Sequence, residues 1–252
     1  MIKLFEEYNN IDSICKKFSI ENYTINPDGS IDVDGNLYLD LNVYPSGKKL
    51  DRFPLKFRKV NGNVDCSNNN LTSLEGCPQE VGGHFDCSNN NLTSLEGYPQ
   101  EVGGHFDCSV NKLTSLEGSP TEVGGNFNCE HNQLISLEGS PKEIGGSLNC
   151  SYNKLTSLKG CPSKIGRSLN CSYNKLTSLK GCPSKIDGDF DCFYNPLPPL
   201  IKQNISIIKR IIRCQDDYSI WNADGTLNEY RFRDMMEEIK GVRWIGTSTL
   251  SV

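Results

Sequence analysis

The chain has 252 residues, of which 36% are apolar and 23% are charged, and its formal net charge is −5 at pH 7. No stretch approaches the roughly 18 to 20 apolar residues that a membrane helix needs, and the N-terminus MIKLFEEYNN lacks the basic start and the apolar run of a secretory signal. We therefore expect one continuous cytoplasmic domain that does not contact a membrane.

Residues 1–39 combine a helical pattern with a strand pattern. Ile11, Cys15 and Phe18 follow helical spacing, whereas the segment YTINPDGSIDVDGNLYLD alternates apolar and polar residues around two Asp-Gly turns. This pattern predicts an N-terminal cap made of a helix and a β-hairpin. A repeat protein needs such a cap, because an uncovered end repeat exposes apolar side chains and an open strand edge.

Residues 61–207 form seven repeats of 21 residues, the last of them degenerate, and each repeat has a cysteine at the same position. A fixed short period predicts a solenoid in which each repeat contacts only its neighbours. Residues 40–60 fall in register with apolar positions of the repeats through Leu50, Phe53 and Val60, so we interpret them as a divergent opening repeat. The cysteines are Cys66, Cys87, Cys108, Cys129, Cys150, Cys171 and Cys192.

The alternation within one repeat indicates where each side chain points. In the strand HFDCS, Phe85 and Cys87 share one face, and we place them inside, whereas His84, Asp86 and Ser88 point outward. Parallel strands would hold the cysteines about 4.8 Å apart, which exceeds the roughly 3.5–4.5 Å between the Cβ atoms of a disulfide. The cysteines are therefore predicted to be buried reduced thiols, with metal ligation and redox chemistry as the alternatives.

An asparagine follows each cysteine after three residues. Its amide has two donors and one acceptor, so a buried column of asparagines is expected to satisfy backbone groups of the turn and of the neighbouring repeat. The column consists of Asn69, Asn90, Asn111, Asn132, Asn153, Asn174 and Asn195.

The unit FDCSNNNLTSL resembles the L-x-L-x-x-N-x-L core of leucine-rich repeats, with cysteine in place of the second leucine. The following L-E-G-x-P segment resembles the short repeats of bacterial secreted effectors. The repeat sequence as a whole is similar to that of short leucine-rich repeat proteins of bacteriophages and large DNA viruses. The resemblance covers about residues 61–207. It implies a leucine-rich repeat solenoid with short parallel strands on a concave face and an irregular or extended convex side. Repeats of this family serve many unrelated binding roles.

Residues 208–252 are predicted to form a helical C-terminal cap. The segment WNADGTLNEYRF has Ile220 and Arg231 where a calcium loop needs carboxylates. The Cys214–Asp216 sequence resembles the active site of bacterial effector ubiquitin ligases but lacks room for their large catalytic domain. Two helical stripes of apolar residues support the cap: Ile201, Ile205, Ile208 and Ile212, then Phe232, Met235, Met236 and Ile239.

No set of residues converges on a catalytic or metal site. The histidines are His84, His105 and His131, and none has a partnered nucleophile. A metal site at His84 and His105 would include Asp86 and Asp107, but the cysteines that would complete a zinc shell point to the opposite face of the strand. We expect no cofactor and no metal, and we predict that the protein is not an enzyme.

The outward positions vary along the repeats while the inward ones stay constant. One outward column changes from amide to aromatic: Asn68, Asn89, Val110, His131, Tyr152, Tyr173 and Tyr194. Its neighbour gains positive charge: Asn70, Asn91, Lys112, Gln133, Lys154 and Lys175. Tyrosine combines large contact area with a polar tip and is enriched in protein interfaces. We predict a partner-binding face formed by His84, Asp86, Asn89, His105, Asp107, His131, Tyr152, Lys154, Tyr173, Lys175 and Tyr194.

The sequence thus predicts a non-enzymatic module that docks a protein partner on its parallel-strand face, and the viral resemblance implies an inhibitor or sequestering factor for a host protein, such as a defence factor. Residues 61–144 contain twelve acids and two lysines, whereas residues 145–186 contain six lysines, Arg167 and no acid. The acidic end disfavours continuous binding along a phosphate backbone. Two alternatives stay open: a binder of single-stranded nucleic acid through the basic repeats, and a specificity subunit of an enzyme or particle.

Overall fold

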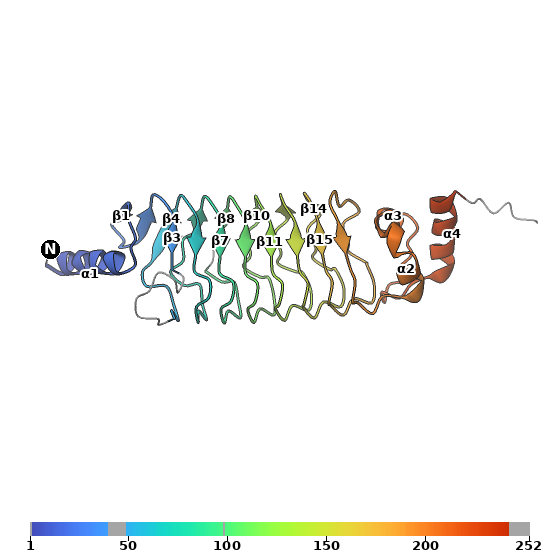
Figure 1. Cartoon of the computed structure of the whole chain (residues 1–252), viewed down its shortest axis with the longest axis horizontal. Helices are drawn as coiled ribbons and strands as arrows, with labels where there is room; N and C mark the ends of the chain where they lie inside the picture. The colour runs from blue at the N-terminus through green and yellow to red at the C-terminus, as the bar shows by residue number, and fades with distance from the viewer. Residues whose placement is uncertain (1, 40–48, 98, 242–252) are drawn as a thin grey trace, which may run out of the picture.

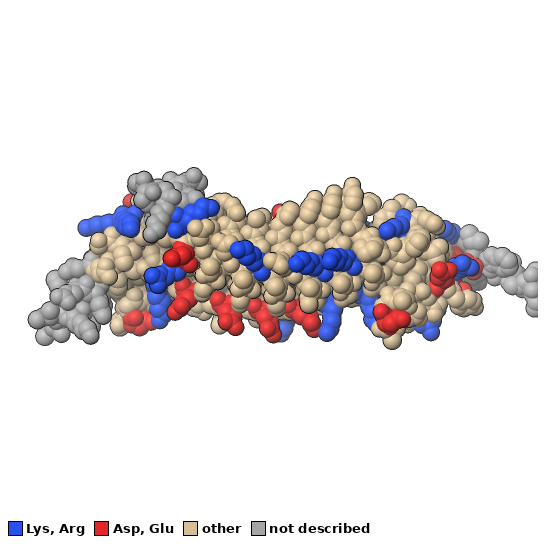
Figure 2. Space-filling model, turned by 90° about the horizontal axis from the view of Figure 1, so that it is seen from below, with Lys and Arg blue, Asp and Glu red and all other residues tan. Residues whose placement is uncertain are grey.

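The structure is a computed structural model that describes residues 2–39, 49–97 and 99–241. Its repeats stack into a solenoid that runs straight in the views of Figures 1 and 2, with α1 at one end and α4 at the other. Each repeat, which we call a rung, contributes strands to two parallel sheets on opposite sides of the core. The predicted solenoid is confirmed, and the repeat of 21 residues is the register of both sheets.

In the regular rungs the strand of the first sheet precedes a glycine pair, such as Gly103-Gly104, which forms a corner. Among the described strands of this sheet, β1 pairs antiparallel and the others pair parallel. Its strands, in spatial order, are β1 (Tyr23–Ile25), β2 (Ile31–Val33), β4 (Phe57–Val60), β6 (Glu80–Val81), β8 (Glu101–Val102), β10 (Glu122–Val123), β12 (Glu143–Ile144) and β14 (Lys164–Ile165).

The second sheet contains the strands that follow the corner, and all its pairings are parallel. Its strands are β3 (Leu37–Tyr38), β5 (Val64–Asp65), β7 (Phe85–Asp86), β9 (Phe106–Asp107), β11 (Phe127–Asn128), β13 (Leu148–Asn149), β15 (Leu169–Asn170) and β16 (Phe190–Asp191). This sheet contains the strands that the sequence predicts, whereas the first sheet lies on the side for which the sequence predicts extended backbone, so that side is also hydrogen-bonded.

The straight axis follows from the presence of a hydrogen-bonded sheet on both sides. A solenoid curves when its two sides advance by different distances per repeat. Here both sides consist of hydrogen-bonded strands, and such strands lie about 4.8 Å apart. The two sides therefore advance equally, so the solenoid has no pronounced concave face in Figures 1 and 2.

The interior of each rung is apolar and closely repeated. Phe85, Cys87, Leu92 and Leu95 are fully buried, and so are their equivalents in the rungs up to residue 186, whereas Phe190 and Leu200 of the last rung are partly buried. The phenylalanines stack from rung to rung, with ring centroids of Phe85 and Phe106 5.4 Å apart. Strand alternation therefore predicted the inward residues correctly, and the cysteines lie inside as expected.

The asparagine column bonds each rung to the one before it. Asn90 Nδ2 donates to the carbonyl oxygens of Cys66, Cys87 and Ser88 at 3.0–3.1 Å, and Asn90 Oδ1 accepts from the N–H of Leu71 at 2.9 Å. Equivalent bonds recur at the other asparagines through Asn195. The structure thus confirms that this buried amide satisfies the backbone of the turn and of the neighbouring rung.

The N-terminal part holds α1 (Ile2–Lys17) and the hairpin of β1 and β2, which turns at Asp28 and Gly29. β2 also pairs with β4, so the hairpin continues directly into the first sheet. Of the predicted opening repeat 40–60, residues 40–48 lie outside the described residues. The N–H of Leu50 donates to Asn69 Oδ1 at 2.8 Å, the same bond that Leu71 makes one rung later.

The C-terminal part consists of helices joined by a turn segment over residues 215–228, and residues 242–252 of the predicted cap lie outside the described residues. α4 (Glu229–Lys240) begins at Asn228, whose side chain accepts from the N–H of Arg231, and ends at Gly241 in a left-handed conformation. The isoleucine stripe is divided among α2 (Pro199–Gln203), the 3₁₀-helix η2 (Ile205–Ile207) and α3 (Ile208–Cys214). No helix within the described ranges has the length and apolar character needed to cross a membrane.

Candidate partner-binding surface

The eleven predicted partner-binding residues fall into two groups. His84, Asp86, His105 and Asp107 lie on or beside the strands of the second sheet. The remaining seven lie beyond these strands, in the turn that follows each inward cysteine, and most of them are aromatic or basic. The second group comprises Asn89, His131, Tyr152, Lys154, Tyr173, Lys175 and Tyr194.

The two sheet-side histidines bond to backbone groups. His84 Nδ1 accepts from the N–H of His105 at 2.8 Å, and His105 Nδ1 accepts from the N–H of Asn126 at 2.7 Å. Their rings stack with centroids 4.4 Å apart. The oxygens of Asn63 and Ser168 accept the equivalent N–H in other rungs, so these histidines perform the same structural role. With Nδ1 engaged, only Nε2 of each ring is directed to other partners.

The close approach of the histidine ring depends on a glycine. A Cβ atom at Gly104 would lie 2.3 Å from His84 Nδ1 and 2.8 Å from the carbonyl oxygen of Gly83. A side chain at this corner would therefore displace both the ring and the neighbouring backbone. The Gly-Gly pair serves the stacking of rungs, and it leaves room for the side chain that bonds to the next rung.

The aspartates of the second sheet are also tied to their own turns. Asp86 Oδ1 accepts from the N–H of Ser88 at 2.9 Å, and Asp107 makes the same bond with Ser109. Burial raises the pKa of Asp86, and the neighbouring charges of Asp107 and Asp65 add to this rise. Among the described residues, no group of three or more His, Cys, Asp or Glu side chains is arranged to hold a metal ion.

The second group lies on an unusual backbone conformation. One residue per rung has a φ between 51° and 58°, in the left-handed region that glycine and asparagine favour. The sequence placed these residues outward but did not predict this conformation for histidine, valine and tyrosine. They are Asn68, Asn89, Val110, His131, Tyr152, Tyr173 and Tyr194.

In the last four rungs this position forms a continuous aromatic stack. Ring centroids are 4.2 Å apart between His131 and Tyr152, between Tyr152 and Tyr173, and between Tyr173 and Tyr194. The side chains are nevertheless exposed, with 42% for Tyr152, 40% for Tyr173 and 71% for Tyr194. Because neighbouring rings cover each other's faces, the stack presents ring edges and hydroxyl groups, and its outermost member, Tyr194, is the most exposed.

In the rungs of Tyr152 and Tyr173, a lysine lies two residues further along the chain. Lys154 Nζ donates to Gln133 Oε1 at 3.1 Å, and Lys175 forms no ion pair within the described part of the chain. We call the set of His131, Tyr152, Tyr173, Tyr194, Lys154 and Lys175 the aromatic ridge. Figure 2 shows a row of basic side chains along the solenoid and, below it, a row in which acidic side chains are followed by basic ones.

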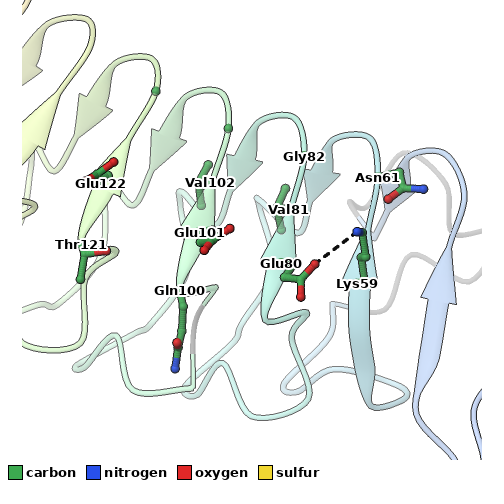
Figure 3. A pocket seen from close by; sticks show the side chains of 12 residues that line it. Lys59, Asn61, Glu80, Val81, Gly82, Gln100, Glu101, Val102, Thr121 and Glu122 are labelled. Atoms are coloured by element: carbon green, nitrogen blue, oxygen red, sulfur yellow. Dashed lines mark ion pairs between the residues drawn. The ribbon is translucent and has the colours of Figure 1, made fainter.

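The first sheet has a different outer face. Glu80, Glu101 and Glu122 form a column that lines a shallow pocket between rungs, and the ion pair of Lys59 with Glu80, at 3.3 Å, closes its N-terminal side (Figure 3). Farther along, the column changes sign where Glu143 pairs with Lys164 at 2.9 Å.

A second outer column changes sign between the same two rungs, where Glu138 pairs with Lys159 at 2.8 Å. The sequence revealed the unequal charges, and the structure places both reversals at one junction along the solenoid.

The thiols of the cysteine column are unreactive because they are buried in the core. Burial raises the pKa of Cys66 and of Cys87 well above the usual range of a thiol, and it raises the pKa of Cys192 to about 12. A buried thiol with a raised pKa is rarely ionised, and the thiolate is the form that reacts or binds metal. The cysteine column is therefore part of the core.

No protein-family model and no curated protein matches the chain. Among solved structures, the chain is similar to YopM from Yersinia enterocolitica WA-314, with 22% sequence identity and a TM-score of 0.37. The match covers 56% of this chain and 38% of the YopM chain, so it spans well under half of that protein. At this level of similarity, the fold and function of the chain are inferred from its own residues.

Proposed function

We propose that the protein is a non-enzymatic binding module that docks a protein partner on its aromatic ridge. The main support is the exposed stack of His131 and three tyrosines. Tyr152 and Tyr173 are at least 40% exposed, although each of these rings has a neighbouring ring stacked on both of its faces. Rigid tyrosines lose little conformational entropy on binding and are common at the centres of protein interfaces.

The proposed contact with the partner lies on the turns that carry the aromatic ridge and not on the strands of the second sheet. His84 and His105 already accept backbone hydrogen bonds, and Asp86 and Asp107 are held by their own turns. The histidines therefore bond one rung to the next, and the aspartates hold the shape of the turns. The ridge side chains make few such bonds, so their variation along the chain is better explained by recognition.

The alternative of single-stranded nucleic acid has weaker support. Proteins that bind single strands without sequence preference stack successive bases on aromatic side chains. In the ridge, the ring faces of Tyr152 and Tyr173 are already covered by neighbouring rings. Only the outer face of Tyr194 is left for a base, so a strand could not stack along the ridge.

A pair of substitutions tests the proposal without disturbing the fold. Tyr152→Asn with Tyr173→Asn removes the aromatic surface, and asparagine already occupies this left-handed position at Asn68 and Asn89. We expect the variant to lose the partner that the wild type captures from cells that produce the protein, as compared by quantitative mass spectrometry. Its melting temperature should change little.

The matched control lies in the same column of the acidic rungs. Asn68→Ser with Asn89→Ser changes the equivalent turns but leaves the ridge intact, so this control should keep the partner. Equal capture by the wild type and the tyrosine variant would show that the ridge is not the binding surface. If a host protein is captured, the viral resemblance of the repeats extends the proposal to sequestering that protein.

A further inference from the structure

The aromatic ridge offers hydrogen-bond donors and positive charge, and the acids nearest to it lie at its two ends, at Glu130 and Asp191. Lys154 and Lys175 flank Tyr152 and Tyr173, and residues 145–186 contain no Asp or Glu. Where earlier rungs have Asp86 and Asp107 on the adjoining strand, these rungs have the neutral residues Asn149 and Asn170. Ser147 and Ser168, which are also neutral, lie two residues before them. A tyrosine hydroxyl and an ammonium group both donate, and a carboxylate is an acceptor that bonds strongly to both.

The charged surroundings limit the length of an anionic ligand. On the N-terminal side lies Glu130, whose carboxylate accepts from Asn149 Nδ2 at 2.6 Å, and on the C-terminal side lie Asp189 and Asp191. From His131 to Tyr194 the ridge spans three rung spacings, or about 14 Å. An extended peptide of about four to five residues covers this distance.

We propose that the aromatic ridge binds a short, extended, acidic segment of a protein partner. This inference rests on the proposed function and adds the chemistry of the partner and the end of the solenoid that it engages. Carboxylates of the segment accept from Lys154, Lys175 and the tyrosine hydroxyls, while its backbone and apolar atoms lie against the ring edges. The acidic rungs before residue 145 repel the same segment, which restricts it to the basic half.

A protein segment fits these limits better than a nucleic acid does. Nucleic-acid affinity grows with the number of phosphates that are neutralised, and a continuous strand extending beyond the ridge would meet Asp189, Asp191 or Glu130. A peptide can place two or three carboxylates over the lysines and neutral residues elsewhere. The acidic flanks therefore select a short acidic motif over a polyanion.

The test is a selection of random heptapeptides, displayed on phage, against the full-length wild-type chain. We expect the recovered peptides to be enriched in Asp and Glu. Synthetic copies, measured by fluorescence anisotropy, should bind about tenfold more weakly to Lys154→Asn with Lys175→Asn, because two charge-assisted bonds are lost. Asparagine is the residue at this column in Asn70 and Asn91, so the fold should be preserved.

A control variant removes the same charge elsewhere. Lys180→Asn with Lys185→Asn lies outside the ridge and should leave peptide affinity unchanged, apart from a small effect that added salt removes. Peptides that are not acidic but depend on Tyr152 and Tyr173 would overturn this inference and leave the docking proposal intact. Peptides that bind independently of the ridge would overturn both.

The nucleic-acid outcome is measured in the same assay. A labelled twelve-residue oligothymidylate should bind more weakly than the selected peptides at physiological salt. Tighter binding of this oligonucleotide, lost in Lys154→Asn with Lys175→Asn, would overturn the acidic-peptide inference in favour of a phosphate-binding surface.

Discussion

The rungs of residues 61–144 and those of residues 145–186 share one interior but differ in their exterior. In both halves the asparagine makes the same bonds to the preceding rung, as Asn90 and Asn174 show. Outside, the first half has a net charge of −10 and asparagine, valine and histidine at the left-handed turn position, whereas the second has +7 and stacked tyrosines. The comparison shows that the shared core is determined by inward residues, so those outward residues that do not bond to a neighbouring rung are available for recognition.

The largest effect should come from breaking the shared interior in either half. Asn90→Ala and Asn174→Ala each leave several buried backbone groups without a partner, and each unsatisfied group costs about 1–3 kcal/mol. We expect each substitution to lower the free energy of unfolding by about 3 kcal/mol or more, and by similar amounts. Urea unfolding, followed by circular dichroism, measures both. A loss confined to one half would mean that the two interiors are not equivalent.

A smaller effect distinguishes the two halves of the second sheet. Burial raises the pKa of Asp86 in the folded state, so ionised Asp86 disfavours folding at neutral pH. Asp86→Asn, which copies Asn149 and Asn170, should therefore raise the melting temperature at pH 7. The wild type regains this stability as the pH falls through the raised folded-state pKa towards the unfolded value of about 3.9. The melting temperatures of the wild type and the variant should converge below that pH. A difference that stays constant with pH would contradict a raised pKa of Asp86 in the folded state.

The smallest effect concerns the junction where both charge columns change sign. Lys159→Glu with Lys164→Glu replaces the ion pairs with Glu138 and Glu143 by repulsion and extends the acidic columns by one rung. Exposed ion pairs contribute little, so we expect a slight drop in melting temperature at low salt that disappears at high salt. A large or salt-independent drop would mean that the lysines have a packing role. The control is Lys180→Glu, because Lys180 forms no ion pair with the described residues.

The sequence predicted the interior well because its pattern is local and repeated. Phe85 and Cys87 alternate with polar residues, and this alternation suffices to place them inside once the period is known. The first sheet could not be predicted in the same way. A strand as short as Glu101–Val102 shows no alternation, and it becomes a strand only because the next rung lies at hydrogen-bonding distance.

The candidate site was predicted in part. The outward column was visible, but the left-handed turn was not, because tyrosine and valine seldom adopt positive φ. A signal was present in Asn68 and Asn89, since asparagine is the side chain that best tolerates this conformation. The structural role of His84 depends on the distance from its ring to the N–H of His105. That distance is set by stacking, and no single repeat contains it.

The equal advance of the two sheets also bears on how such a chain can change in length. Because every rung presents the same bonds to the rung on either side, gain or loss of one whole 21-residue unit leaves the interior complete and the axis straight. Only the distance between the two ends changes, by about 4.8 Å for each unit. Duplication of a single unit carrying tyrosine and lysine would therefore lengthen the ridge in register, which gives this architecture a simple genetic route to a longer binding surface.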